Sequence, residues 1–275
     1  MKKILAILIA TLVLTTQVLA DITENKKTTI AFYQAIYSGE DTSQFIGDGY
    51  VEHQLGTGFT LDGLRQLATQ SEGVVTVHRV IAQDGLVFLH VEQQNGEDSI
   101  ARGELFRLDD NGLVVEHWGN QQIAVPASKT KSGNSMFDGV TEVNPGSQTA
   151  IKYGPAHLKA MDVFWNTLDT SIIPGALTDA YIQHNPGGVN GPKGILGLAD
   201  FLRSKGITLE KVLHQSVSEG DFIVKLNFYR STPPVPGFGQ AFAFDIIRLA
   251  KDGRADEHWD IIENIENIGD LKNLY

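Results

Sequence analysis

The segment Tyr50–Gln54 reads YVEHQ, and 131 residues later (181 − 50 = 131) Tyr181–Asn185 reads YIQHN. At the same offset, Gly63–Ala68 is answered by Gly194–Ala199. Two motifs that recur in the same order and at the same spacing indicate an internal duplication. The chain of 275 residues is also long enough for two ordinary small domains.

A third motif shows where the copies differ in length. Glu116–Trp118 (EHW) recurs as Glu257–Trp259, at an offset of 141 (257 − 116 = 141). The second copy has therefore gained 10 residues (141 − 131 = 10). They fit the segment Ser231–Gly237, whose prolines cannot sit inside a sheet and so predict a longer loop.

The hydrophobic pattern of each copy predicts helices followed by strands. An amphipathic helix opens each copy, a short second helix leads into the Tyr-x-x-His segment, and a third helix covers Asp62–Thr69 or Lys193–Ser204. Helices before a run of antiparallel strands predict an α+β fold. The strands are expected at Val74–Ile81, Leu86–Gln93, Ile100–Leu108 and Val114–Ile123, and again at Leu209–Val217, Phe222–Tyr229, Ala241–Leu249 and Ala255–Ile262.

The first 20 residues have the features of a secretory signal peptide. Met1–Lys3 is basic, Ile4–Val18 is almost wholly apolar, and small residues close the segment at Ala20. The apolar run is shorter than the roughly 20 residues that a membrane-spanning helix needs. We therefore expect a periplasmic or secreted protein without membrane insertion, divided into a signal peptide (1–20), a first domain (21–125), a linker (126–149) and a second domain (150–275).

Composition excludes several classes of function. The chain contains no cysteine, so disulfides, thiolate nucleophiles and cysteine-ligated metals are ruled out. Its formal charge is −11, and it would be −13 without Lys2 and Lys3. With no cluster of lysine and arginine after the signal peptide, nucleic acid and anionic lipid surfaces are not expected as partners.

Polar residues that share one strand face suggest a site in the second copy. The strand period of two places His258 and Asp260 on one face, and Asp245 on the preceding strand alternates with apolar neighbours. With Tyr181 and His184 they form a candidate cluster. The matching positions of the first copy are Tyr50, His53, Glu104, His117 and Gly119. Gly119 stands where the second copy has Asp260, so the first copy lacks one carboxylate.

The second copy resembles a known family in three places, Tyr181–Pro186, Asp245–Arg248 and Asp252–Asp260. Together these segments resemble the SnoaL-like polyketide cyclase branch of the nuclear transport factor 2-like superfamily, and the resemblance extends to the first copy. It implies two cone-shaped domains, each with a curved antiparallel sheet wrapped around its N-terminal helices and one apolar pocket. It also implies that the tandem copies meet through their outer sheet faces as a pseudo-dimer.

The resemblance further implies cofactor-free acid–base chemistry, such as aldol ring closure, on a small apolar or carbonyl-containing molecule. Asp260 and His258 are then the best-matched catalytic residues, followed by Asp245 and His184. Burial among Phe242, Phe244 and Ile247 would raise the pKa of Asp260 or Asp245 toward that of a general base. The expected ligand-binding residues are Tyr181, Asn185 and Phe244 in the second copy and Tyr50, His53, Glu104 and His117 in the first.

Two other interpretations stay open. His258 could simply bond a buried carboxylate and hold two strands together. The whole protein could be a non-catalytic module that binds hydrophobic ligands or proteins, since one fold hosts many functions. The sequence also leaves open whether any reaction is cyclisation, isomerisation or hydration. No metal site is expected, because neither a His-x-x-x-His pair nor a cysteine is present.

Overall fold

The computed structural model describes residues 22–71, 73–235, 239–266 and 268–274. The predicted signal peptide (1–20) lies outside the described residues. Two five-stranded sheets form the framework, with strand orders β1-β5-β4-β3-β2 and β6-β10-β9-β8-β7. No helix in the described part of the chain has the length and apolar character to cross a membrane.

The two halves of the chain repeat one order of elements, so the predicted α+β class and the duplication are confirmed. The first half consists of a helix over residues 22–38, η1 (Ser43–Phe45), β1 (Ile46–Glu52), α2 (Leu61–Gln70), β2 (Val74–Gln83), β3 (Leu86–Asn95), β4 (Asp98–Leu108) and β5 (Val114–Ile123). After η2 (Ala127–Lys129), the second half consists of α3 (Thr149–Thr167), η3 (Thr170–Ile172), α4 (Ile173–Ala176), β6 (Leu177–Gln183), α5 (Lys193–Ser204), β7 (Thr208–Glu219), β8 (Phe222–Thr232), β9 (Gln240–Leu249), β10 (Ala255–Asn264) and η4 (Ile268–Asn273).

Each sheet is mixed, whereas the sequence predicted an antiparallel one. Four strands are antiparallel neighbours as expected, but the Tyr-x-x-His segment begins within a fifth strand that pairs in parallel with the last strand. The reason is the connection, since α2 or α5 and three further strands separate the two paired strands and let them run in the same direction. This pairing sets Glu52 beside His117 and Gln183 beside His258.

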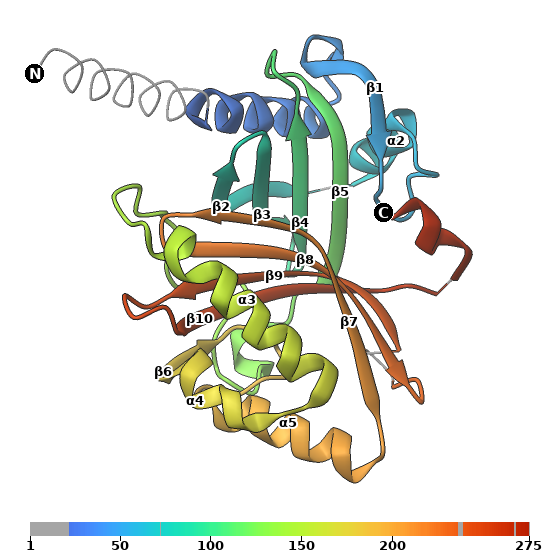
Figure 1. Ribbon diagram of the computed structural model, residues 1–275. Helices are drawn as coiled ribbons and strands as arrows, with labels where there is room; N and C mark the ends of the chain where they lie inside the picture. Colours follow the sequence, from blue (N-terminus) through green and yellow to red (C-terminus); the bar gives the residue numbers. More distant parts are fainter. Residues whose placement is uncertain (1–21, 72, 236–238, 267, 275) are drawn as a thin grey trace, which may run out of the picture.

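The two faces of the second sheet serve different purposes. Along β9, Phe242 and Phe244 belong to an apolar cluster that includes Phe88 of the first half. The alternate residue Ile247 packs instead with Phe164 of α3. The helices thus cover the inner face of this sheet, and the outer face meets the first half, with the strands of one sheet running across those of the other (Figure 1).

Close approach and hydrogen bonds join the outer faces of the two sheets. The rings of Phe88 and Phe244 lie 5.0 Å apart. Gly103 permits this packing, because a Cβ atom there would lie 2.5 Å from the Phe244 ring. The buried amide of Asn120 donates to the backbone oxygens of Phe242 (3.1 Å) and Ile261 (2.7 Å). Apolar burial and satisfied backbone oxygens therefore both stabilise the contact.

The segment 126–149, expected to be a linker, packs against both halves. Its side chains Met136 and Phe137 are buried in the shared core. Its backbone is held by side chains, since Arg79 donates to the oxygen of Val140 (2.8 Å) and the Trp259 indole donates to that of Asp138 (2.8 Å). Despite its polar composition, this segment therefore follows a fixed path along the contact between the two halves.

Candidate functional site

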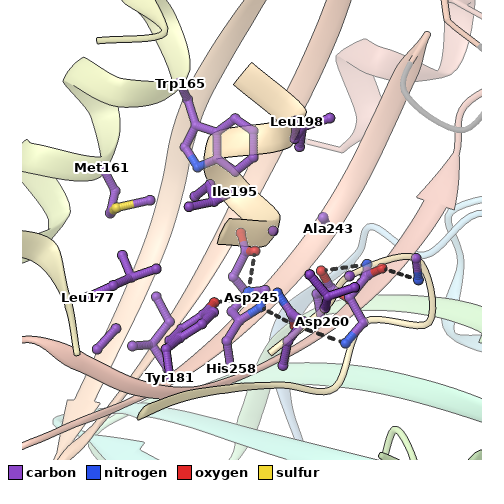
Figure 2. A pocket seen from close by; sticks show the side chains of 18 of the residues that line it. Met161, Trp165, Leu177, Tyr181, Ile195, Leu198, Ala243, Asp245, His258 and Asp260 are labelled. Carbon is purple, nitrogen blue, oxygen red and sulfur yellow. Dashed lines mark hydrogen bonds and ion pairs between the residues drawn. The ribbon is translucent and has the colours of Figure 1, made fainter. Parts of the chain in front are cut away.

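A cavity of about 660 Å³ lies in the second half, between the inner face of the sheet and the helices α3 and α5. Most of its wall is apolar, and Figure 2 shows the carboxylates of Asp245 and Asp260 grouped with His258 on one side of it. The labelled apolar lining residues are Met161, Trp165, Leu177, Ile195, Leu198 and Ala243. A concave, mostly apolar chamber with a few convergent polar groups is typical of a small-molecule site.

His258 is fixed at both ring nitrogens. Its Nε2 lies 3.0 Å from Oδ1 of Asp245, and its Nδ1 lies 2.9 Å from Oε1 of Gln183. The ring of Tyr181 stacks over it at 6.3 Å. The parallel pairing of β6 with β10 supplies Gln183, which the sequence had not indicated as a site residue. The orientation of this imidazole is therefore determined by the protein and not by a ligand.

Asp245 is a stabilised anion. Its Oδ2 accepts hydrogen bonds from Asn227 and from the Tyr229 hydroxyl (2.9 Å), and Lys225 Nζ lies 3.8 Å away. Burial acts to raise the pKa of Asp245, but Lys225 and His258 outweigh it and hold the pKa well below its usual range. The expectation that burial would make Asp245 a general base is thus wrong, because its neighbours favour the charged form.

Asp260 has the environment that was expected of a general base. Both of its oxygens are contacted by the Asn185 amide nitrogen, at 2.8 and 2.9 Å. Burial raises the pKa of Asp260 to about 6, with the Asp245 charge adding to the rise and His258 opposing it. A carboxylate with this pKa is ionised at neutral pH and able to accept a proton.

Lys225 and His157 also line the cavity, and the sequence reasoning missed both. Lys225 is 2% exposed, and burial lowers its pKa to about 8 although Asp245 opposes the change. Neither ring nitrogen of the buried His157 has a hydrogen-bond partner in the described part of the chain. Burial, and then the charge of Lys225, lower the pKa of His157 to about 3, so its imidazole is neutral. The one sequence signal was Lys225 itself, a charge inside an otherwise apolar strand.

His184 and Phe244 do not join the cluster. His184 lies against the outer face, where its ring stacks on Trp259 at 4.8 Å and its nitrogens contact Glu257 (3.1 Å) and the Ser135 oxygen (2.7 Å). Phe244 lies on the same outer face, because it alternates with Asp245 along β9. Neither residue lines the cavity. The structure therefore brings together Tyr181, Asn185, Asp245, His258 and Asp260 and leaves these two in the domain contact.

The matching residues of the first half form a buried charge network. His117 Nδ1 lies 3.0 Å from Glu52, and its Nε2 lies 2.9 Å from Glu104. Burial would lower the pKa of His117, but the two carboxylates, Glu52 first, raise it to about 10. The imidazole is therefore charged at neutral pH. Tyr50 donates to Glu52 (2.6 Å), and Tyr33 donates to Glu104 (3.1 Å).

Larger side chains occupy the interior of the first half. Arg102, 1% exposed, stands where the second half has Ala243, and its Nε donates to Gln93 (2.9 Å). A Cβ atom at Gly119 would lie 2.5 Å from Gln54 Oε1, so Gln54 takes the space that the Asp260 side chain uses in the second half. His53 repeats the structural role of His184, since it stacks on Trp118 at 4.9 Å. Of the first-half residues that were expected to bind ligand, Glu104 and His117 bind each other, Tyr50 binds Glu52, and His53 contacts Glu116.

The same cluster has donor atoms of the kind that bind metal ions. Ligand atoms of Asp245, His258 and Asp260 lie within 4.8 Å of one another. Both oxygens of Asp245 already accept bonds, however, and the ammonium of Lys225 is 3.8 Å from one of them. A cation held that close opposes a second one. The residues present therefore fit a charge-balanced organic site better than a metal site.

Comparisons with known proteins give structural neighbours only. No protein-family model matches the chain, and neither does any curated protein. Similar solved structures include a candidate polyketide cyclase from Bacillus cereus (21% identity, 48% of this chain and 88% of the other, TM-score 0.35). They also include an epoxide hydrolase-like protein from M. tuberculosis (18%, 47% and 92%, TM-score 0.34) and a SnoaL-like family protein from Agrobacterium tumefaciens (18%, 41% and 99%, TM-score 0.31). The names of the Bacillus cereus and Agrobacterium tumefaciens proteins agree with the predicted resemblance, and the activities in all three names are properties of those proteins.

Proposed function

We propose that the second half binds a small apolar molecule with a carbonyl group and removes a proton from the carbon next to that carbonyl. The observation that carries this proposal is Asp260, a buried carboxylate with a pKa raised to about 6 on the wall of a largely apolar cavity. Proton abstraction of this kind underlies aldol-type cyclisation and isomerisation alike. It needs a base whose pKa approaches the working pH.

Tyr181 supplies the complementary acid in this proposal. Burial, with the charges of Asp260 and Asp245, raises the pKa of Tyr181 well above its usual value, so the phenol keeps its proton. The phenol lines the same cavity as Asp260 and can donate to the developing enolate oxygen. His258, bonded at both nitrogens, serves as a positioning residue, and Asn185 orients the base.

Hydrogen–deuterium exchange tests the chemistry without knowledge of the natural substrate. A panel of apolar ketones is incubated with the protein in D₂O, and exchange at the carbon next to the carbonyl is followed by NMR. We expect Asp260→Asn to slow the exchange by about 100-fold or more, the usual share of a general base. Asp256→Asn is the matched control, because Asp256 pairs with Arg248 (2.7 Å) outside the cavity. Equal exchange in wild type and Asp260→Asn would refute the catalytic proposal.

The second candidate is a pocket that binds the same class of molecule and does not convert it. The unpartnered ring nitrogens of His157 favour it, because a ligand could satisfy them without any reaction. Native mass spectrometry of the purified protein separates the two candidates. A stoichiometric, unchanged ligand that shows no exchange supports binding alone.

Export and the pairing of the halves complete the proposal. We propose that residues 1–20 direct the chain out of the cytoplasm, and N-terminal sequencing of secreted material should then begin at Asp21. We also propose that the halves behave in solution as one pseudo-dimer, which the apolar contact of Phe88 with Phe244 supports. A small-angle scattering profile of two separated bodies would contradict it.

A further inference from the structure

The ammonium group of Lys225 is placed unusually for a structural lysine. It is 2% exposed and lines the cavity, yet its nearest ionic partner, Oδ2 of Asp245, is 3.8 Å away and beyond hydrogen-bond distance. Asp245 does not need it as a donor, because His258, Asn227 and Tyr229 already bond its two oxygens. Among the described residues, no hydrogen-bond acceptor is seen for this amine.

The other buried lysine of this half shows the contrast. Lys211 is 5% exposed, and its Nζ donates directly to Asp162. It does not line the cavity. Lys211 therefore has an ordinary structural ion pair, whereas Lys225 presents its amine to an enclosed space.

The first half shows that the fold does not need a lysine here. Lys225 is paired with Asp245 across β8 and β9, and the corresponding partner of Glu104 across β3 and β4 is Leu89. Leu89 is fully buried. An apolar side chain is thus sufficient at this strand position, even beside a buried carboxylate.

We infer that Lys225 is a nucleophilic amine that forms an imine with an aldehyde or ketone held in the cavity. The Nζ lone pair attacks the carbonyl carbon, and a proton passes from nitrogen to oxygen to give a carbinolamine. The carbon–oxygen bond then breaks, the leaving hydroxide takes up the proton that the Lys225 ammonium had released, and one water departs to leave the protonated imine (iminium). The step consumes no oxidant or reductant. This inference rests on the proposed pocket and its carbonyl ligand but does not require Asp260 to act as a base.

The electrostatics of the cavity suit this step. The neutral amine is the attacking form, and burial lowers the pKa of Lys225 to about 8, so a sizeable fraction is neutral near that pH. The resulting iminium keeps the positive charge within reach of Asp245. The charge balance of the site is therefore the same before and after the reaction.

Reductive trapping tests the inference. The full chain is incubated at pH 8 with a limiting amount of naphthaldehyde and cyanoborohydride, and the modified lysine is identified by proteolysis and mass spectrometry. We expect labelling of Lys225 at least 10-fold above that of any other lysine. Labelling spread over exposed lysines, with Lys225 unmodified, would overturn the inference.

Variants separate this inference from the proposed function. Lys225→Met should lose the adduct and, as Leu89 suggests, keep the fold, while Lys211→Met and Asp260→Asn should retain the adduct. Quenching of tryptophan fluorescence reports binding through Trp165 of the cavity wall. Quenching without a Lys225 adduct would support the binding pocket and contradict the covalent step. An absence of quenching and adduct contradicts the carbonyl-binding pocket itself.

Discussion

The two histidines of the repeated EHW motif occupy the same place in two sheets and have different surroundings. His117 lies between two carboxylates, Glu52 and Glu104, and is almost fully buried. His258 lies between one carboxylate and one amide, Asp245 and Gln183, and borders a cavity. One framework thus supports a closed charge network in the first half and an open chamber in the second.

Three matched positions explain the difference. Arg102 fills the interior of the first half where Ala243 leaves room in the second. Gly119 has lost the carboxylate that Asp260 supplies. At the third position, the second half has the buried amine of Lys225 where the first half has an apolar residue. The comparison supports the proposal that the second half holds the binding site and that the first half stabilises the fold.

The largest effect is expected on the closed network, from Glu52→Gln, which copies the amide of the second half. Removing one carboxylate from beside a buried imidazolium should lower the free energy of unfolding by about 3 kcal/mol at pH 6. The pKa of His117 is about 10 in the folded protein, above the unfolded value of about 6.5. The network therefore stabilises fully below pH 6.5 and loses its effect as the pH rises through 10.

Urea denaturation at pH 6 and pH 10 measures that change. The difference between wild type and Glu52→Gln should shrink at the higher pH. Glu24→Gln is the control, since Glu24 forms only an exposed pair with Lys27 and should change stability by less than about 0.5 kcal/mol. A similar loss in both variants would show that the buried network has no special role.

The next effect concerns the open chamber. Ala243→Arg copies the residue that fills the first half and should weaken binding of an apolar ketone by about 100-fold, or about 2.7 kcal/mol. Isothermal titration calorimetry measures the affinity, and a thermal melt checks that the variant folds. Unchanged affinity in a folded variant would place the ligand somewhere other than this cavity.

The smallest effect is expected on stability from Asp260→Asn. The pKa of Asp260 is raised to about 6, so ionising it costs more in the folded protein than in the unfolded chain. Wild type should lose stability as the pH rises from about 4 through 6, and the variant should not. At pH 8 the full shift corresponds to about 3 kcal/mol. We expect Asp260→Asn to be more stable than wild type by about 2 kcal/mol, because a neutral amide accepts the Asn185 hydrogen bonds more weakly than the carboxylate, and the gap should close near pH 4. A variant that is less stable at pH 8 would mean that Asp260 supports the fold.

Much of the framework was predictable from the sequence. The repeat, the helices, eight strands and the convergence of Asp245, His258 and Asp260 all follow from spacing and from the strand period of two. The parallel pairing of β1 with β5 and of β6 with β10 was not predictable, because the sequence of a short apolar strand does not indicate which strand it pairs with. His184 was misplaced for that reason, since only the pairing shows that it turns to the outer face.

Lys225 was missed for a different reason. A lysine within a strand is normally expected to reach solvent, and its burial depends on Asp245 lying opposite on the neighbouring strand. That cross-strand register arises only in the folded protein, so the local sequence does not reveal it. The first copy does not indicate a buried lysine either, because Leu89 lies at the matching position.

The contrast between a closed first half and an open second half can be tested most directly by counting bound molecules. Native mass spectrometry of the full chain with an apolar ketone should show one ligand per chain, which disappears in Ala243→Arg. Two ligands per chain, or one that persists in Ala243→Arg, would contradict the assignment of the site to the second half alone.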